Sequence, residues 1–104
     1  MPNLIRPALP AEVELAIGVM GSRAQAQVLR TLSILGPSTI GRLQGSVDIG
    51  RPSLNRHLDF LSRAGLVQTD PPAGLRQGKD VVYAVQPARL RRLVADYVSY
   101  VEGS

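Results

Sequence analysis

The segment "SLNRHLDFLSRAGLV" (residues 53–67) constrains the fold more than any other part of the sequence. Leu54, Leu58 and Leu61 recur at the three- and four-residue spacing of an amphipathic helix. Gly65 fits the left-handed position just past a helix end, and the apolar pair that follows it has the character of a strand. The segment therefore predicts a helix and a strand that pack against one core.

The other side of this helix is polar and carries Asn55, Arg56, Asp59 and Arg63. A solvated surface and a surface that reads nucleic acid give the same pattern at this level. The neighbouring elements and the charge distribution must therefore decide between them.

The rest of the chain divides into helices and strands by its apolar spacing and its turn residues. Ser22 is the expected cap of the second helix, with Gln25 completing a capping box, and Ser38 is the expected cap of the short third helix. The expected helices cover residues 10–21, 22–36, 39–46, 51–64 and 87–102, and the expected strands cover residues 66–70 and 80–85.

This order of elements predicts a mostly α fold with a small β-hairpin, a winged helix-turn-helix of the order α-α-α-α-β-β-α. The 104 residues suffice for one domain with one core. We expect an extended, proline-containing arm at residues 1–9 and the winged helix-turn-helix domain at residues 10–104. The nine residues between the two strands are too many for a tight turn, so they should project as a wing.

The composition excludes several kinds of site. The chain has no cysteine and a single histidine, which excludes disulfides, cysteine nucleophiles and a multi-histidine metal site in one chain. His57 has no nucleophile or carboxylate at a recognisable catalytic spacing, so we expect no enzyme and no cofactor. No apolar run has membrane-spanning length, and no leader-like segment is present, so we expect a cytoplasmic protein of bacterial type, associated with the nucleoid.

The net charge of +4 is concentrated in one part of the chain. Residues 51–92 hold eight basic and three acidic residues, and eleven of the twelve basic residues of the chain are arginine. Arginine suits contacts with phosphate and guanine, so the concentration favours an anionic partner, most simply nucleic acid. A surface excess that only aids solubility is the alternative.

The stretch "RLQGSVDIGRPSLNRHLDFLSRAGLV", followed by "KDVVYAV", resembles the winged-helix regulators of the ArsR/SmtB type. Leu43, Val47 and Ile49 match the hydrophobic positions of the first motif helix and the turn. The run "LNRHL" matches the "V-S-R-H-L" core of that family, with Asn55 in place of the usual serine. Helix-turn-helix, "AGLV" and wing occur in one continuous register, and the resemblance covers roughly residues 10–101.

The resemblance implies a role in double-stranded DNA binding for several exposed residues. Arg56 should contact guanine in the major groove, Asn55 adenine and Ser53 phosphate, although either of the last two could simply be solvated. Arg51 at the helix start should contact phosphate. The full set of expected DNA contacts is Arg42, Arg51, Ser53, Asn55, Arg56, Arg76, Gln77 and Lys79, of which the last three lie at the tip of the wing, where a mobile polar loop is the alternative.

In this family the first and last helices form a homodimer, and both helices of this chain carry an apolar excess. The expected interface residues are Val13, Ile17, Leu90, Leu93, Val94, Tyr97 and Val101. Packing of both helices onto their own core is the alternative. The cysteine pairs and last-helix histidines of the family's metal sensors are missing, so we expect a regulator without a metal site.

The sequence thus predicts a sequence-specific transcriptional regulator, a repressor that binds an inverted-repeat operator as a homodimer. An architectural or recombination accessory DNA-binding protein is one alternative. A winged-helix module that binds other proteins is the second.

Overall fold

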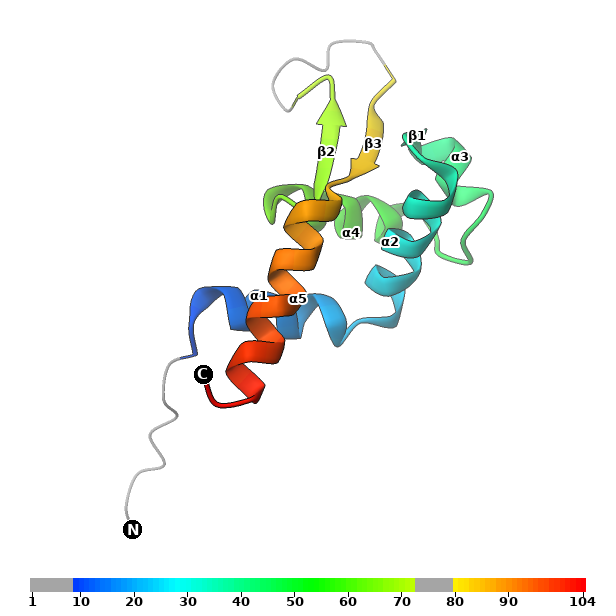
Figure 1. Cartoon of the computed structure of the whole chain (residues 1–104). Coiled ribbons are helices and arrows are strands. Elements are labelled where there is room, and N and C mark those ends of the chain that lie inside the picture. The colour runs from blue at the N-terminus through cyan, green and yellow to red at the C-terminus, as the bar shows by residue number, and fades with distance from the viewer. Residues whose placement is uncertain (1–8, 73–79) are drawn as a thin grey trace.

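The computed structural model describes residues 9–72 and 80–104. Five helices and a small sheet at one end of the molecule follow in the order expected from the sequence, with one additional strand (Figure 1). The elements are α1 (Ala11–Met20), α2 (Arg23–Leu35), β1 (Ser38–Thr39), α3 (Ile40–Gln44), α4 (Arg51–Arg63), β2 (Val67–Asp70), β3 (Val82–Val85) and α5 (Pro87–Val101).

The sheet has three antiparallel strands in the order β1-β3-β2. The predicted hairpin of β2 and β3 is present, and β1 is a third strand that was not predicted. Tyr83 in β3 lies opposite Thr69 of β2 on one side and opposite Ser38 of β1 on the other. β1 is only two residues long, so no alternation of apolar and polar residues could predict it. Its extended conformation comes from pairing with β3, which is a tertiary contact.

The short helix α3 begins one residue later than expected. Thr39 is its cap, because the Thr39 hydroxyl accepts a hydrogen bond from the backbone N–H of Arg42 at 3.3 Å. The buried Ser38 hydroxyl instead donates to the carbonyl of Gly36 at 2.8 Å. The assignment of Ser38 as the cap was therefore wrong, because β1 holds Ser38 in the sheet.

At the start of α2, only half of the expected capping box forms. The Ser22 hydroxyl accepts from the backbone N–H of Gln25 at 3.2 Å. The Gln25 side chain does not return the bond, because the N–H of Ser22 is directed at the carbonyl of Val19 at 3.4 Å. Ser22 thus forms hydrogen bonds with both helices: its N–H donates to α1, and its hydroxyl accepts from α2.

The end of α4 has the predicted form. Gly65 has a φ of +78°, and its N–H donates to the carbonyl of Ser62 at 3.1 Å. The N–H of Leu66 donates to the carbonyl of Leu61 at 3.0 Å, which completes a Schellman cap between two fully buried leucines. This cap turns the chain from α4 directly into β2.

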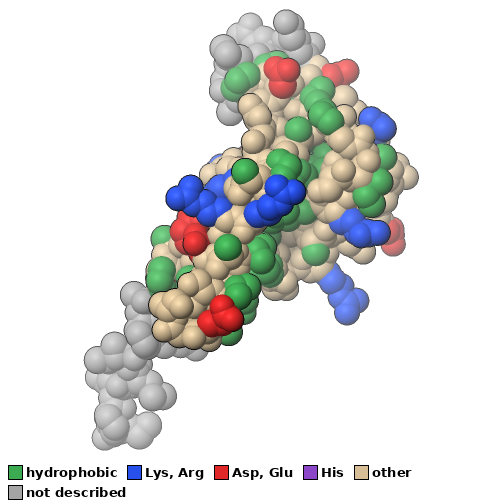
Figure 2. Space-filling view, in the orientation of Figure 1, with side chains coloured by type: hydrophobic (Ala, Val, Ile, Leu, Met, Phe, Trp, Pro, Cys, Tyr) green, Lys and Arg blue, Asp and Glu red, His purple; other side chains and the backbone are tan. Residues whose placement is uncertain are grey.

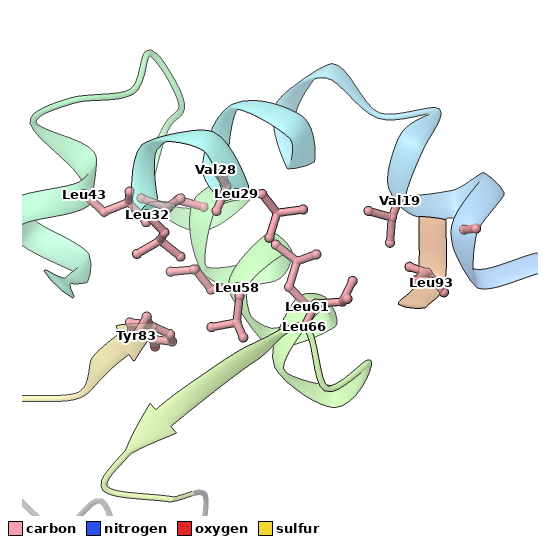
Figure 3. Close-up of a cluster of buried hydrophobic side chains, with 13 residues drawn as sticks. Val19, Val28, Leu29, Leu32, Leu43, Leu58, Leu61, Leu66, Tyr83 and Leu93 are labelled. Atoms are coloured by element: carbon pink, nitrogen blue, oxygen red, sulfur yellow. The ribbon is translucent and has the colours of Figure 1, made fainter. Parts of the chain in front are cut away.

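The core lies between α2, α4 and the sheet and extends to α1 and α5 (Figure 3). α4 contributes three fully buried leucines to it, and α5 contributes Leu93. The buried members of this cluster are Ala16, Val19, Val28, Leu29, Leu32, Leu43, Leu54, Leu58, Leu61, Leu66, Val67, Tyr83 and Leu93.

α1 packs against α5 at the end of the molecule away from β2 and β3 (Figure 1). The buried side of α1 consists of Val13, Ala16 and Val19, whereas Ile17 and Met20 are 44% and 42% exposed. A helix that is apolar nearly all round gives two equivalent candidate faces, and only one of them is buried here.

Candidate nucleic-acid interface

The exposed side of α4 carries the polar residues on which the sequence analysis depended. Leu54, Leu58 and Leu61 are fully buried, which directs the opposite side of the helix outward. Asn55 and Arg56 are exposed on that outward side, as are Arg51, Asp59 and Arg63. The fold thus presents α4 as a helix with a leucine side in the core and a charged side in solvent.

Two arginines at the start of α4 already have polar partners within the chain. The Arg56 guanidinium donates to the hydroxyl of Ser53 at 3.0 Å, so the structure brings two of the predicted DNA-contacting residues together. Arg51 donates to the side-chain oxygen of Gln44 on α3 at 3.5 Å. Both contacts are solvent-exposed, so a phosphate or base edge can replace them at small cost.

The start of α4 lacks a side-chain cap. Gly50 occupies the capping position in an extended conformation, with no side chain to accept from the first backbone N–H groups. The helix begins at Arg51, and a Cβ at Gly50 would meet no atom within 4 Å, so the approach to this helix end is open. An open, uncapped helix start beside an arginine suits the binding of an anionic group.

A hollow surface runs on both sides of Tyr83, between α4 and the sheet. One hollow of about 330 Å³ is lined by Asn55, Arg56, Asp59, Ser62 and Tyr83. The other, of about 420 Å³, is lined by Thr39, Ile40, Gly41, Arg51, Asp80, Val81 and Tyr83. Since Tyr83 lines both, the starts of α3 and α4, the outer side of α4 and β3 share one surface.

Arg42 is exposed on α3, one turn after the Thr39 cap. Arg76, Gln77 and Lys79, the predicted wing contacts, lie outside the described residues. Strands β2 and β3 lead into that segment from opposite ends (Figure 1). The wing contacts therefore stay a prediction.

Asp59 lies on the predicted polar side of α4 but had no predicted role. Asp59 accepts a hydrogen bond from Arg63, one turn further along α4, and both side chains are more than half exposed. The hydrogen bond that Arg63 donates to this carboxylate raises the pKa of the Arg63 guanidinium. Four-residue spacing on a predicted helix was the available signal for this pair.

The expected dimer residues separate into three groups by their exposure. Val13 and Leu93 are 3% and 0% exposed, so they belong to the core of the single chain and were wrongly placed on an interface surface. Leu90, Val94 and Tyr97 are half-buried. Ile17 and Val101 are exposed, together with Met20, Val98 and Tyr100, which the expected set had omitted.

These exposed side chains lie on α1 and α5, where hydrophobic groups interrupt the polar surface (Figure 2). A second charged pair lies between the same two helices. Arg89 of α5 donates two hydrogen bonds to Glu12 of α1, and this contact lowers the pKa of the Glu12 carboxyl. Nothing in the sequence signalled it, because the two residues are distant along the chain.

Within residues 9–72 and 80–104, no three histidine, aspartate or glutamate side chains form a group that could hold a metal ion. No helix within those same ranges is long and apolar enough to cross a bilayer. His57 is half-buried at the edge of α4.

Comparisons with known proteins identify the fold. A scan of protein-family models and a search of curated proteins each give no match. Among solved structures, an ArsR family transcriptional regulator is similar at a TM-score of 0.66 and 23% identity, covering 88% of this chain and 93% of the other.

Two further structures agree. An ArsR-like transcriptional regulator from Rhodococcus sp. RHA1 has a TM-score of 0.68 at 17% identity, covering 88% of this chain and 81% of its own. The transcriptional repressor BigR from Xylella fastidiosa has a TM-score of 0.60 at 23% identity, covering 86% of each chain. The chain therefore has the winged helix-turn-helix fold of ArsR-type regulators.

Proposed function

We propose that this protein is a sequence-specific double-stranded DNA-binding transcriptional regulator. The observation that carries the proposal is the two-sided character of α4, with three fully buried leucines on one side and Asn55 and Arg56 exposed on the other. A single helix of this kind fits the width of the major groove. The fold shared with transcriptional regulators supports the same conclusion.

In this proposal α4 is the recognition helix in the major groove. α3 supports α4 and itself lies against the DNA backbone. Arg56 contacts guanine, and Asn55 contacts adenine. Ser53 and Arg51 contact phosphates at the open start of the helix, and Arg42 contacts backbone from α3. The positive charge of residues 51–92 supplies the attraction that does not depend on sequence.

We propose further that the protein acts as a homodimer through α1 and α5. The exposed side chains of Ile17, Val98 and Val101 lie on these two helices, on a domain too small to bury every apolar surface in its own core. A two-fold axis would place two copies of α4 in successive major grooves, about 34–36 Å apart, and favour an inverted-repeat operator. Binding there would block a promoter, which is the action expected of a repressor.

Selection of bound sequences from random duplex DNA, at two salt concentrations, tests the proposal. Enrichment of an inverted repeat with half-sites about one helical turn apart is the expected result. Salt-sensitive binding that enriches no sequence would indicate an architectural protein instead. If the protein binds no DNA at low salt, the proposed function is wrong, and a protein-interaction module is favoured.

A further inference from the structure

Asp59 is the only carboxylate on α4. The other charged side chains of the helix are Arg51, Arg56 and Arg63. Asp59 lies on the outward side, and its side chain is 56% exposed. It lines the hollow beside Tyr83 together with Asn55 and Arg56, so it belongs to the surface assigned to DNA reading.

A carboxylate on such a surface has a definite energetic consequence. The DNA backbone carries one negative charge per phosphate, so an acidic side chain there lowers the affinity for every duplex unless it meets a matching base edge. An ionised carboxylate only accepts hydrogen bonds. Its position on α4 is therefore unfavourable for non-specific binding and informative about specific binding.

Only one base offers a suitable edge in the major groove. Cytosine presents its N4 amino group as a donor, and aspartate can accept from it. Adenine also presents an amino group, but the N7 acceptor beside it repels a carboxylate, and guanine and thymine present acceptors. The chemistry of Asp59 thus selects cytosine.

In the free protein, Arg63 holds Asp59 by a hydrogen bond along the helix. The Arg63 and Asp59 side chains are 78% and 56% exposed, and such a pair contributes little to stability. A DNA phosphate can therefore compete for Arg63 and release the Asp59 carboxylate toward a base. The Arg56 guanidinium donates to Ser53 and forms no ion pair with Asp59.

Resting on the proposed function, we propose that Asp59 is a specificity-determining residue of α4. Its carboxylate accepts from N4 of a cytosine at a base pair close to the guanine contacted by Arg56, three residues earlier on the helix. The same carboxylate lowers the affinity for sequences that lack this cytosine. Asp59 therefore sets specificity both by attraction and by repulsion.

The test compares the selected sequences of the wild-type protein with those of Asp59→Asn and Asp59→Ala. Wild type should select a half-site that contains the cytosine. Asp59→Asn should change that one position to adenine, because an amide pairs with adenine N6 and N7. Asp59→Ala should lose the preference at that position and bind unrelated duplex DNA more tightly than wild type does. The ratio of its affinities for the selected site and for unrelated DNA should therefore be about tenfold smaller.

Glu102→Gln is the matched control, since it removes one exposed carboxylate just after α5 and should leave the selected sequence unchanged. Circular dichroism of both Asp59 variants establishes that they fold. If wild type selects an operator and both Asp59 variants select the same base at every position, the inference is wrong and Asp59 serves only Arg63. If wild type selects no sequence, the proposed function itself fails.

Discussion

Arg89 and Glu12 connect the last helix to the first across 77 positions of the chain. The Nη1 and Nη2 atoms of Arg89 donate to the two carboxylate oxygens of Glu12 at 2.6 and 3.1 Å. The Arg89 side chain also lies near Gly65, just past the end of α4, with its Nε 3.7 Å from the point where a Cβ on Gly65 would stand. One side chain of α5 therefore pairs with α1 and lies near the glycine that follows α4, the helix assigned to DNA reading.

Glu12→Gln should lower the melting temperature slightly, because this ion pair is partly exposed. The hydrogen bond from Arg89 lowers the pKa of Glu12 from its ordinary value of 4.5. A group with a lowered pKa stabilises the fold above its unfolded-state pKa, and this stabilisation is lost as the pH falls through the folded-state pKa. Between about pH 5 and pH 3, the melting temperature of wild type should therefore fall more steeply than that of Glu12→Gln.

Glu14→Gln is the control for that experiment, because Glu14 lies exposed in the same first turn of α1. Its pH dependence should follow that of wild type. Equal slopes for wild type and Glu12→Gln would show that the pair does not contribute.

Gly65→Ala should destabilise the protein by about 1 kcal/mol. The added Cβ meets the Arg89 side chain only at ordinary contact distance, so the cost arises from the φ of +78° and not from crowding. Urea unfolding measures the effect. Gly41→Ala, in a helix with open space around it, should be neutral or stabilising, and a larger loss at Gly41 than at Gly65 would contradict the cap assignment.

Leu58→Ala should lower the free energy of unfolding by about 2–5 kcal/mol, because Leu58 is fully buried at the centre of the cluster in Figure 3. Ile34 on α2 is 67% exposed, so Ile34→Ala should change stability by no more than about 0.5 kcal/mol. Denaturant titration of the two variants compares them directly. Similar losses would mean that α4 is not packed as described.

Val101→Asp should weaken the proposed dimer, raising its dissociation constant by about tenfold or more. Val101 is 64% exposed on α5, so the change places a charge on the proposed interface without disturbing the core. Sedimentation equilibrium measures the association. Ile34→Asp is the control, because Ile34 has a similar exposure, 67%, on a helix outside the interface; a dimer equally stable in both variants would exclude this surface.

Arg56→Ala should relax the sequence preference at one position of each half-site, with a loss of about 1–3 kcal/mol in discrimination. Competition between the selected operator and single-base variants of it measures this loss. Arg30→Ala removes an equal charge from the outer side of α2 and should leave the preference unchanged. Full discrimination in Arg56→Ala would remove this residue from base reading.

The helices were predictable because their information is local. The leucines of α4, the glycine that ends it and the proline in its first turn all act within a few residues of one another, and the structure follows them closely. The exposed side of α4 followed from the same spacing, because burying Leu54 and Leu58 leaves Arg56 on the outside. The sequence by itself therefore determined the order of helices and the surface proposed to read DNA.

The features that sequence reasoning missed depend on partners far away in the chain. Strand β1 exists because Ser38 pairs with Tyr83, and no two-residue pattern can announce such pairing. The buried side of α1 was decided by the position of α5, because an almost wholly apolar helix does not specify which side it buries. Tertiary packing alone placed Leu93 in the core and left Val101 exposed, since both residues belong to the same apolar stripe of α5 and only the neighbouring elements decide which part of it is covered.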